Sequence, residues 1–439
     1  MSARHAAACG CGLVLALAVA LATARAVPQS DGDDRSLFTA LELDAIFRHS
    51  PLPRLARGAA DSVADDARAA RFGQYLFFER RFSIDGSVSC ASCHEPEKAF
   101  ADGRRVGRGT ETGERNTPTL LNTAFNHWFF WDGRADSLWA QALGPIENAK
   151  EFGGDRLNTL HVVAEDPALR RAYASVFGML PPLDDVRRFP RHAFPDPNSS
   201  SPAARAWAAM AAADRDAANR MFANLGKAIE AYERRLVNER SEFDHYVAAL
   251  KSGDRAQQRA YPGAAKRGLK LFVGAAQCEL CHSGAAFSDG EFHNNGLPVL
   301  VEGMRDIGRM AGIPVVRASI FNATGPFSDD AAGEPKDRLA YLPPPKSQLG
   351  AFKTPGLRNV ALTAPYMHDG RFESLEEVLE FYAKSENDGQ KKTLVGEREA
   401  TLGLIPDLSK AQLADLAAFL RTLTGTAVQA ALTGPPDSP

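Results

Sequence analysis

The sequence predicts a mainly helical protein built from two similar modules. One five-residue motif occurs twice, as CASCH at residues 90–94 and as CELCH at residues 278–282. The segments around the two motifs also resemble each other, and apolar residues recur at helical spacing with little of the alternation typical of strands. A duplicated helical module explains these observations together.

The repeat extends well beyond the motifs. Matching pairs of segments are RFGQYLF at 71–77 and RGLKLF at 267–272, AFADG at 99–103 and AFSDG at 286–290, TPTLLN at 117–122 and TPGLRN at 354–359, and DGR at 132–134 and 369–371. Ser137 and Ser374 follow the last pair at equal distances. Matching blocks in one order indicate duplication. The segments before each motif predict amphipathic helices that lead into it.

The motif spacing has a chemical reason. Two thiols three residues apart can add to the two vinyl groups of one haem, and the following histidine can bind its iron. The sequence therefore predicts two c-type haems, attached at Cys90 and Cys93 and at Cys278 and Cys281. The expected iron ligands are His94 and His282. Half of a zinc site is the alternative, but it leaves the histidine unexplained in both motifs.

The chain begins with features of a secretory leader. A short positive start at residues 4–5 precedes an apolar run at 13–22 and a small-x-small site at 24–26. The run is too short to span a bilayer as an anchor. We expect residues 1–26 to be a signal peptide that directs the chain to the periplasm, with no membrane span after processing. The other two cysteines, Cys9 and Cys11, fall in this segment.

The repeat suggests the domain boundaries. We predict a first haem domain at residues 27–252, a second at 253–430 and a tail at 431–439, of which 434–439 is expected to fray. Residues 222–250 are predicted to form one long helix. Residues 181–202 and 325–345 are predicted to be surface loops. The formal net charge of −3 argues against a nucleic-acid binder.

These residues resemble a known family, the bacterial di-haem cytochrome c peroxidases and their MauG-like relatives. Besides the two motifs, the resemblance rests on FFWDGR at 129–134, the stretch at 141–151 and TAPYMHDG at 363–370. It implies two cytochrome c-like domains with a calcium ion between the haems. It also implies that the N-terminal haem reacts with peroxide and that the C-terminal haem accepts electrons.

The repeat itself predicts how the two haems differ. Met367 of the second module matches Phe130 of the first. A thioether can bind iron and raise its reduction potential, whereas a phenyl ring cannot bind it. We therefore expect Met367 to be the sixth ligand of the second haem, and the first haem to be open. Met367 could instead be a core residue, and Tyr366 and His368 are competing ligands, because MauG-like members use a tyrosine.

The resemblance also assigns the peroxide site. Glu151 and Gln141 match the family's distal glutamate and glutamine, with Glu151 as the acid/base and Gln141 orienting peroxide or water. A solvated loop carboxylate is the alternative for Glu151. Phe152 stands where the family often has methionine.

Further roles follow from the same resemblance. Trp131 matches the tryptophan between the haems, and a buried core residue is the alternative. Asn116 matches the residue whose amide oxygen binds calcium, a cation that prefers oxygen ligands. Arg134 and Arg358 are candidate partners of haem propionates.

One difference from many members concerns activation. Those members carry a histidine, in the loop after the first motif, that blocks the first iron until the second haem is reduced. This chain has no histidine between His94 and His127. We therefore expect the oxidised protein to be active without prior reduction.

The function predicted from the sequence is reduction of hydrogen peroxide to water. The electrons would come from a small redox protein, such as a c-type cytochrome or a cupredoxin. Two alternatives are a MauG-like oxidase that modifies a partner protein and a di-haem electron carrier or sensor without catalysis. A homodimer is compatible with the sequence, and a nucleic-acid partner is not expected.

Overall fold

The computed structural model describes residues 32–56, 61–196, 199–238, 240–300, 305–330, 335–384 and 394–439. Within these ranges the protein is mainly helical, which confirms the predicted fold class, and its one sheet has two short strands. The helices are α1 (Ala40–Arg48), α2 (Ala67–Phe78), α3 (Cys90–Cys93), α4 (Leu138–Glu147), α5 (Arg156–Glu165), α6 (Pro167–Phe177), α7 (Pro202–Ala209), α8 (Ala212–Glu233), α9 (Glu242–Ser252), α10 (Arg255–Ala260), α11 (Gly263–Val273), α12 (Arg309–Ala318), α13 (Pro335–Ala340), α14 (Leu375–Ala383) and α15 (Lys410–Arg421). The strands β1 (Phe292–His293) and β2 (Phe352–Lys353) pair antiparallel.

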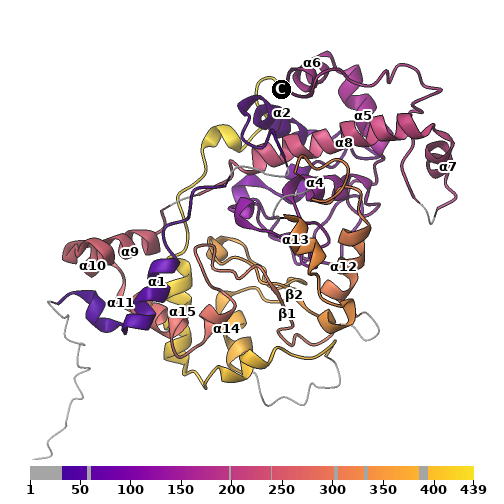
Figure 1. Ribbon diagram of the computed structural model, residues 1–439. Helices are drawn as coiled ribbons and strands as arrows, with labels where there is room; N and C mark the ends of the chain where they lie inside the picture. The colour runs from indigo at the N-terminus through magenta and orange to yellow at the C-terminus, as the bar shows by residue number, and fades with distance from the viewer. Residues whose placement is uncertain are drawn as a thin grey trace, which may run out of the picture.

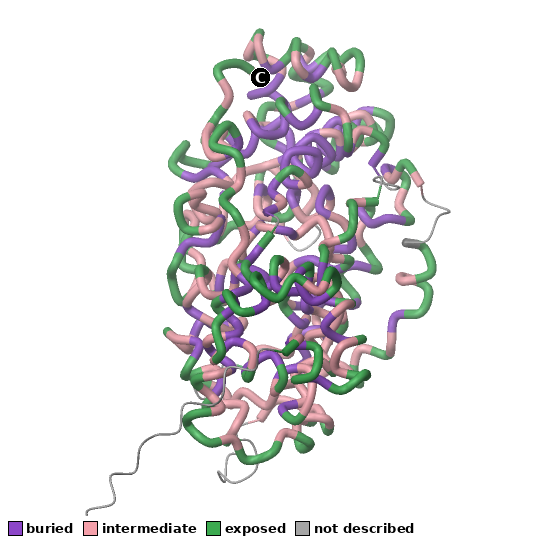
Figure 2. Tube along the Cα trace, turned by 90° about the vertical axis from the view of Figure 1, so that its left-hand side faces the viewer, coloured by how far each residue is buried: buried purple, intermediate pink, exposed green. Residues whose placement is uncertain are grey.

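The helices gather around two main cores. In the first module, α2 and α4 pack against the long helix α8 (Figure 1). In the second, α11 packs against α15. Buried segments run through the interior of both halves, whereas the outer turns are exposed (Figure 2). Each core therefore surrounds one of the two motifs.

A glycine allows the main helix pair of each module to meet closely. A Cβ atom added to Gly73 of α2 would lie 1.7 Å from the carbonyl oxygen of Ala228 in α8. A Cβ atom added to Gly268 of α11 would lie 2.0 Å from the carbonyl oxygen of Asp415 in α15. The two glycines match in the sequence repeat, so both modules use the same helix crossing.

The backbone repeats as the sequence does. Asn122 and Asn359 have φ values of 62° and 65°, and Phe130 and Met367 have φ values of 63° and 74°. Residues other than glycine rarely adopt this left-handed region. Ser137 and Ser374, which also match in the repeat, cap α4 and α14 through their side chains. The two modules therefore share a strained turn as well as helices.

Some segments that precede the predicted domain boundary at residues 252 and 253 are buried in the second core. Phe243 and Leu250 of α9 are buried in the second core, because the apolar face of α9 points there. Ile46 of α1 lies in the same core, although it is near the N-terminus. Figure 1 shows α1 beside α11, far from the end of the chain marked C. The second core thus takes in segments from the predicted first domain.

The prediction of one helix over residues 222–250 is wrong. Helix α8 ends at Glu233, and α9 begins only at Glu242. Ser241 accepts a hydrogen bond from the Asp244 backbone, and the Asp244 carboxylate accepts one from the Ser241 backbone. This capping box starts a new helix and is visible in the sequence as Ser-x-x-Asp.

The C-terminal segment contacts the first module up to Gly434. It crosses back to the first module (Figure 1), where Leu432 is buried beside Phe77. The hydroxyl of Tyr232 donates to the carbonyl oxygen of Leu432 at 2.6 Å. The side chain of Gln74 donates to the carbonyl oxygens of Ala431 and Gly434, both at 2.7 Å. These contacts fix the segment on α2 and α8.

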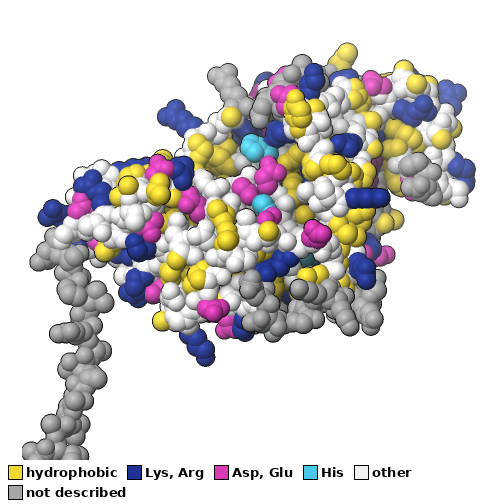
Figure 3. Space-filling model, turned by 60° about the horizontal axis from the view of Figure 1, so that its bottom comes forward, with side chains coloured by type: hydrophobic (Ala, Val, Ile, Leu, Met, Phe, Trp, Pro, Cys, Tyr) yellow, Lys and Arg dark blue, Asp and Glu magenta, His cyan; other side chains and the backbone are white. Residues whose placement is uncertain are grey.

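In the loop predicted at residues 181–202, the described residues form no helix before α7, but the Leu183 and Phe189 side chains are buried in the first core. The segment at 325–345 includes helix α13. The predicted signal peptide lies outside the described residues. Among the described helices, none has the length and apolar character needed to cross a membrane. On the face shown in Figure 3, basic and acidic side chains are interspersed.

Candidate active site

The first motif is arranged to hold a haem. It forms helix α3, and the backbone N–H of His94 donates to the carbonyl oxygen of Cys90 at 2.9 Å. Nδ1 of His94 lies 3.1 Å from the carbonyl oxygen of Phe100, which leaves Nε2 for a metal ion. Cys90 and Cys93 form no disulfide bond. Cys93 and His94 line a cavity of about 890 Å³.

The second motif has the same geometry. The N–H of His282 donates to the carbonyl oxygen of Cys278 at 2.9 Å, and Nδ1 of His282 lies 3.0 Å from the carbonyl oxygen of Phe287. Phe100 and Phe287, which hold the two histidines, have φ values of 56° and 55°. Burial lowers the pKa of both histidines, which favours the neutral imidazole that binds iron. Both motifs therefore fit a covalently attached haem.

The predicted peroxide-site residues share the cavity of the first motif. Phe130, Trp131, Gln141 and Glu151 all line it together with His94. Gln141 lies on α4, Phe130 and Trp131 lie in the turn before that helix, and Glu151 lies in the loop after it. The structure thus brings together residues that the sequence predicted to act together.

Glu151 is a partly buried carboxyl in this wall. Its Oε1 accepts a hydrogen bond from Nδ2 of Asn148 at 2.7 Å. Burial raises the pKa of Glu151, although the charge of Arg134 and the bond from Asn148 act in the opposite direction. A raised pKa makes a carboxyl a stronger proton acceptor, as a general acid/base requires.

The loop after the first motif is tied to Glu151. The backbone N–H of Thr110 donates to the carbonyl oxygen of Glu151 at 2.8 Å, and that of Glu111 donates to the carbonyl oxygen of Lys150 at 3.1 Å. A Cβ atom on Gly109 would lie 2.2 Å from the carbonyl oxygen of Glu151. The loop without a histidine is therefore held against the cavity wall.

Phe130 and Met367 occupy equivalent turns. Each turn is closed by an antiparallel bridge, Phe129 with Ala135 and Tyr366 with Phe372. The guanidinium of Arg134 lies 3.5 Å from the centre of the Phe130 ring. Around Met367, the side-chain amide of Asn295 donates to the sulfur at 3.6 Å.

The competing ligands beside Met367 have other contacts. The hydroxyl of Tyr366 donates to the carbonyl oxygen of Val360 at 3.0 Å, and its ring packs against the second core. The imidazole of His368 stacks on the ring of Phe352, with 3.6 Å between centroids, and lines the first cavity. Both side chains are therefore engaged in contacts within the protein.

Trp131 lies where the two modules meet. Its indole N–H donates to the carbonyl oxygen of Asn116 at 2.9 Å, and its own carbonyl oxygen accepts from the backbone N–H of Lys353 at 2.9 Å. Nδ2 of Asn116 donates to the carbonyl oxygen of Arg104 at 3.0 Å, which leaves the amide oxygen for another partner. A hard cation such as calcium fits an oxygen in this position.

The two predicted propionate partners differ. Arg134 lines the cavity and pairs with Asp132 at 3.1 Å. Arg358 is buried, and its guanidinium forms two hydrogen bonds with the carboxylate of Asp244, at 2.8 and 3.0 Å. Its other donors reach the carbonyl oxygens of Ala285 and His49. The contacts of Arg358 therefore argue against a propionate role, because its donors are already used within the protein.

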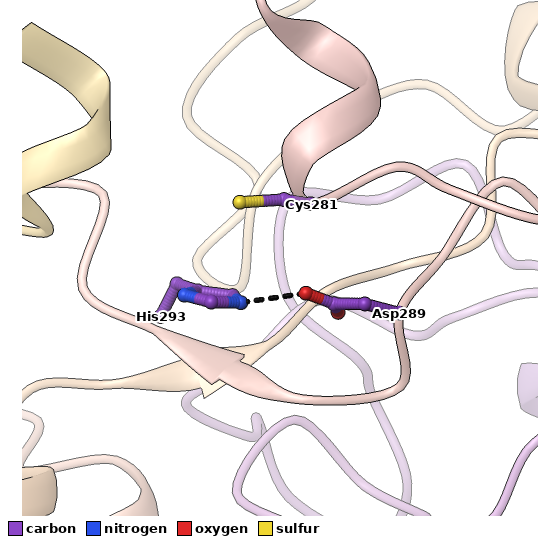
Figure 4. A group of neighbouring side chains, drawn as sticks. All are labelled: Cys281, Asp289 and His293. Carbon is purple, nitrogen blue, oxygen red and sulfur yellow. Dashed lines mark hydrogen bonds and ion pairs between the residues drawn. The ribbon is translucent and has the colours of Figure 1, made fainter. Parts of the chain in front are cut away.

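A third group of side chains near the second motif was not predicted. Ligand atoms of Cys281, Asp289 and His293 lie within 4.8 Å of one another (Figure 4). The two imidazole nitrogens of His293 form hydrogen bonds with the carboxylates of Asp289, at 2.8 Å, and Glu399, at 3.0 Å. The hydrogen bond with Asp289, together with that with Glu399, raises the pKa of His293. Because Cys281 belongs to the haem motif, we interpret the group as a charged histidine held by two carboxylates.

Comparisons with known proteins agree with this geometry. The family described as di-haem cytochrome c peroxidase matches residues 67–252. The methylamine utilization protein MauG of Methylorubrum extorquens is 32% identical over 354 residues, which cover 80% of this chain and 76% of that protein. The cytochrome-c peroxidase IdrP1 of Denitromonas iodatirespirans is 31% identical over 382 residues, which cover 86% of each chain.

A solved structure shows a similar fold. The crystal structure of a MauG-like protein associated with microbial copper homeostasis matches with a TM-score of 0.60 and 27% identity, and the match covers 88% of this chain and 98% of that one. The motifs, their repeated geometry and these relatives lead to one conclusion. The chain belongs to the family of di-haem cytochrome c peroxidases and MauG proteins, whose members carry two c-type haems.

Proposed function

We propose that this protein reduces hydrogen peroxide to two molecules of water with two protons and two electrons from a small redox protein. The observation that carries the proposal is the cavity beside His94, where Glu151, with its raised pKa, lies near Gln141. Phe130 cannot bind iron, so this side of the first haem would be open to peroxide.

The protein's own residues would handle the protons. Glu151 would take a proton from one oxygen of peroxide and return it to the other as the bond between them breaks. Asn148 holds the carboxylate through its hydrogen bond, and Gln141 would orient peroxide from α4. The bound haem would supply the redox chemistry. Arg134 would pair with one of its propionates from the cavity wall.

Electrons would enter through the second module. Met367, as sixth ligand, would raise the potential of the second haem so that it accepts electrons. Trp131, fixed by its bond to Asn116, would lie on the path to the first haem. Asn116 would also provide an amide oxygen to a calcium ion at this interface. Export to the periplasm, where a donor such as a c-type cytochrome or a cupredoxin would meet the protein, completes the proposal.

The test is turnover of hydrogen peroxide with a reduced c-type cytochrome, comparing the protein as isolated with the protein reduced by one electron. We expect two molecules of cytochrome to be oxidised per peroxide in both preparations. Absence of turnover in both, with two haems attached and several donors tried, would contradict the proposal.

Oxidation of a partner protein is the second candidate, favoured by 32% identity to a MauG protein. In that case Tyr366, not Met367, is expected to bind the second iron. The bond from Tyr366 to the carbonyl oxygen of Val360 favours peroxidase. Replacement Tyr366→Phe separates the two: the spectrum of the second haem should stay unchanged in a peroxidase and should change if tyrosine is its ligand.

A further inference from the structure

The turn that carries Phe130 and Trp131 is strained. Phe130 has φ 63° and Gly133 has φ 64°. A side chain in the left-handed region persists only where its surroundings hold the backbone in place. For this turn, several of the contacts come from the second module.

The backbone carbonyl oxygens of the three residues after Phe130 all accept hydrogen bonds from the second module. The carbonyl oxygen of Trp131 accepts from the backbone N–H of Lys353 in β2 at 2.9 Å. The carbonyl oxygens of Asp132 and Gly133 both accept from Nη1 of Arg309, the first residue of α12, at 3.2 and 2.5 Å. One side chain therefore holds two consecutive peptide groups of the turn.

Arg309 is itself firmly placed. It is 1% exposed, and its guanidinium lies between two rings, 4.2 Å from the centre of Trp128 and 4.0 Å from the centre of Phe292. A Cβ atom on Gly133 would lie 2.4 Å from Nη1 of Arg309 and 2.3 Å from the ring of Phe292. The turn and the guanidinium thus fit together only with glycine at position 133.

The side chain of Asp132 has a separate set of ionic contacts. Its carboxylate pairs with Arg115 at 2.6 Å, and Arg115 pairs in turn with Asp306 at 2.7 Å. Asp306 and Arg309 are three residues apart at the start of α12. This segment of the second module therefore contacts the turn in two ways. Arg309 donates to backbone carbonyl oxygens of the turn, and Asp306 pairs with Arg115, which pairs with Asp132.

We propose that Arg309 is a positioning residue that holds the turn at residues 130–133 from the second module. It thereby sets the place of Phe130 at the open face of the first haem and of Trp131 between the two modules. The placement of Trp131 on an electron path rests on the proposed function, but the effect on Phe130 depends only on the family's two haems.

The experiment uses Arg309→Met, which removes both hydrogen bonds, and Arg309→Lys, which keeps the charge without the planar fork. The control is Arg317→Met on the exposed side of the same helix, where Arg317 donates to the carbonyl oxygen of Leu342. Each purified di-haem protein is first checked for two attached haems and for its melting temperature. The ferric first haem is then examined by electron paramagnetic resonance and by the kinetics of cyanide binding.

We expect Arg309→Met to give more than one ferric species at the first haem and multiphasic cyanide binding, because the turn can then relax. Transfer of one electron from the second haem to the first should slow by about tenfold or more, as small displacements have large effects on rates. Arg309→Lys should show smaller changes in the ferric species, in cyanide binding and in electron transfer. Arg317→Met should match the wild type in all three.

A folded Arg309→Met protein with a single unchanged ferric species, uniform cyanide binding and wild-type electron transfer would overturn the proposal. If Arg309→Met does not fold, the same measurements on Arg309→Lys decide, and wild-type behaviour there overturns it as well. Failure of wild-type peroxide turnover would contradict the proposed function only, since none of these measurements uses peroxide.

Discussion

Phe130 and Met367 show how one backbone serves two tasks. Both lie in turns with a positive φ, both are followed by Asp-Gly-Arg, and the helix after each turn is capped by a matching serine. The side chains at this position differ: a ring that cannot bind iron in the first module, and a thioether that can in the second. Duplication followed by one change at this position would separate an open haem from a closed one.

The surroundings differ in the same direction. Gln141, four residues after the capping serine of α4, matches Val378 in α14. The first module therefore has an amide where the second has an apolar side chain. Arg134 and its match Arg371 each pair with the aspartate two residues earlier, but Arg134 also stacks on Phe130, whereas Arg371 donates to the carbonyl oxygen of Pro298.

The largest expected effect comes from Glu151→Gln, which removes the titratable group but keeps its size. Turnover of peroxide should fall by about 10²- to 10⁴-fold, with both haems still attached, because proton transfer is lost. The control is Glu114→Gln, an exposed carboxylate on the same cavity that pairs with Lys150. Equal turnover in Glu151→Gln and the wild type at saturating peroxide would assign the proton transfer to another group.

The pH dependence of the wild type tests the same residue. Glu151 must be unprotonated to accept a proton, so kcat/KM should fall as the pH drops through its pKa. Because burial raises this pKa, the acid limb should lie above about pH 4.3, the ordinary value for glutamate. Glu151→Gln should lose this limb, and a limb that persists unchanged would point to a different acid.

Phe130→Met tests whether the two turns are equivalent. If the repeated backbone places a thioether as Met367 is placed, the first iron should become six-coordinate and low-spin. Turnover should then fall by about tenfold or more, because peroxide must compete with the new ligand. Optical spectra of the ferric protein check this. An unchanged high-spin signal would show that a methionine at position 130 does not bind the first iron, and that the two turns are not equivalent.

Met367→Ala should have a smaller effect on turnover and a clear one on the second haem. Loss of the thioether should lower the potential of that haem and slow electron delivery to the first by about tenfold. The control is Met179→Ala, at a side chain that is 95% exposed. A near-infrared charge-transfer band of the methionine type that survives in Met367→Ala would assign the ligand elsewhere.

The glycine pair provides the smallest effect and compares the stability of the modules. Gly73→Ala and Gly268→Ala each introduce a methyl group against a backbone carbonyl of the facing helix. Each should destabilise its module by about 1–3 kcal/mol, as overpacking does. Thermal unfolding measures this against Gly434→Ala, where nothing lies within 4 Å of the added carbon. Unchanged melting in both variants would contradict the tight crossings.

The sequence predicted features that depend on local pattern, and it failed for those that depend on long-range contacts. The motifs, the repeat and the shared position of Gln141 and Glu151 near His94 follow from short segments. Arg358 is a propionate candidate by sequence because a guanidinium pairs well with a carboxylate. Its partner Asp244 lies 114 residues earlier, and no local signal points to that contact. The contacts of Arg309 could not be predicted for the same reason, since the carbonyl group of Asp132 that it binds lies 177 residues away in the sequence. The capping box at Ser241, in contrast, was a local signal that hydrophobic periodicity obscured.

The central claim is that the first haem is open and the second is closed in the oxidised protein. Titration of the fully ferric protein with cyanide, followed by electron paramagnetic resonance, tests it most directly. We expect one high-spin ferric haem that converts to a low-spin cyanide complex without prior reduction, and one low-spin haem that does not respond. Two low-spin six-coordinate haems, with cyanide binding only after reduction by one electron, would contradict the account.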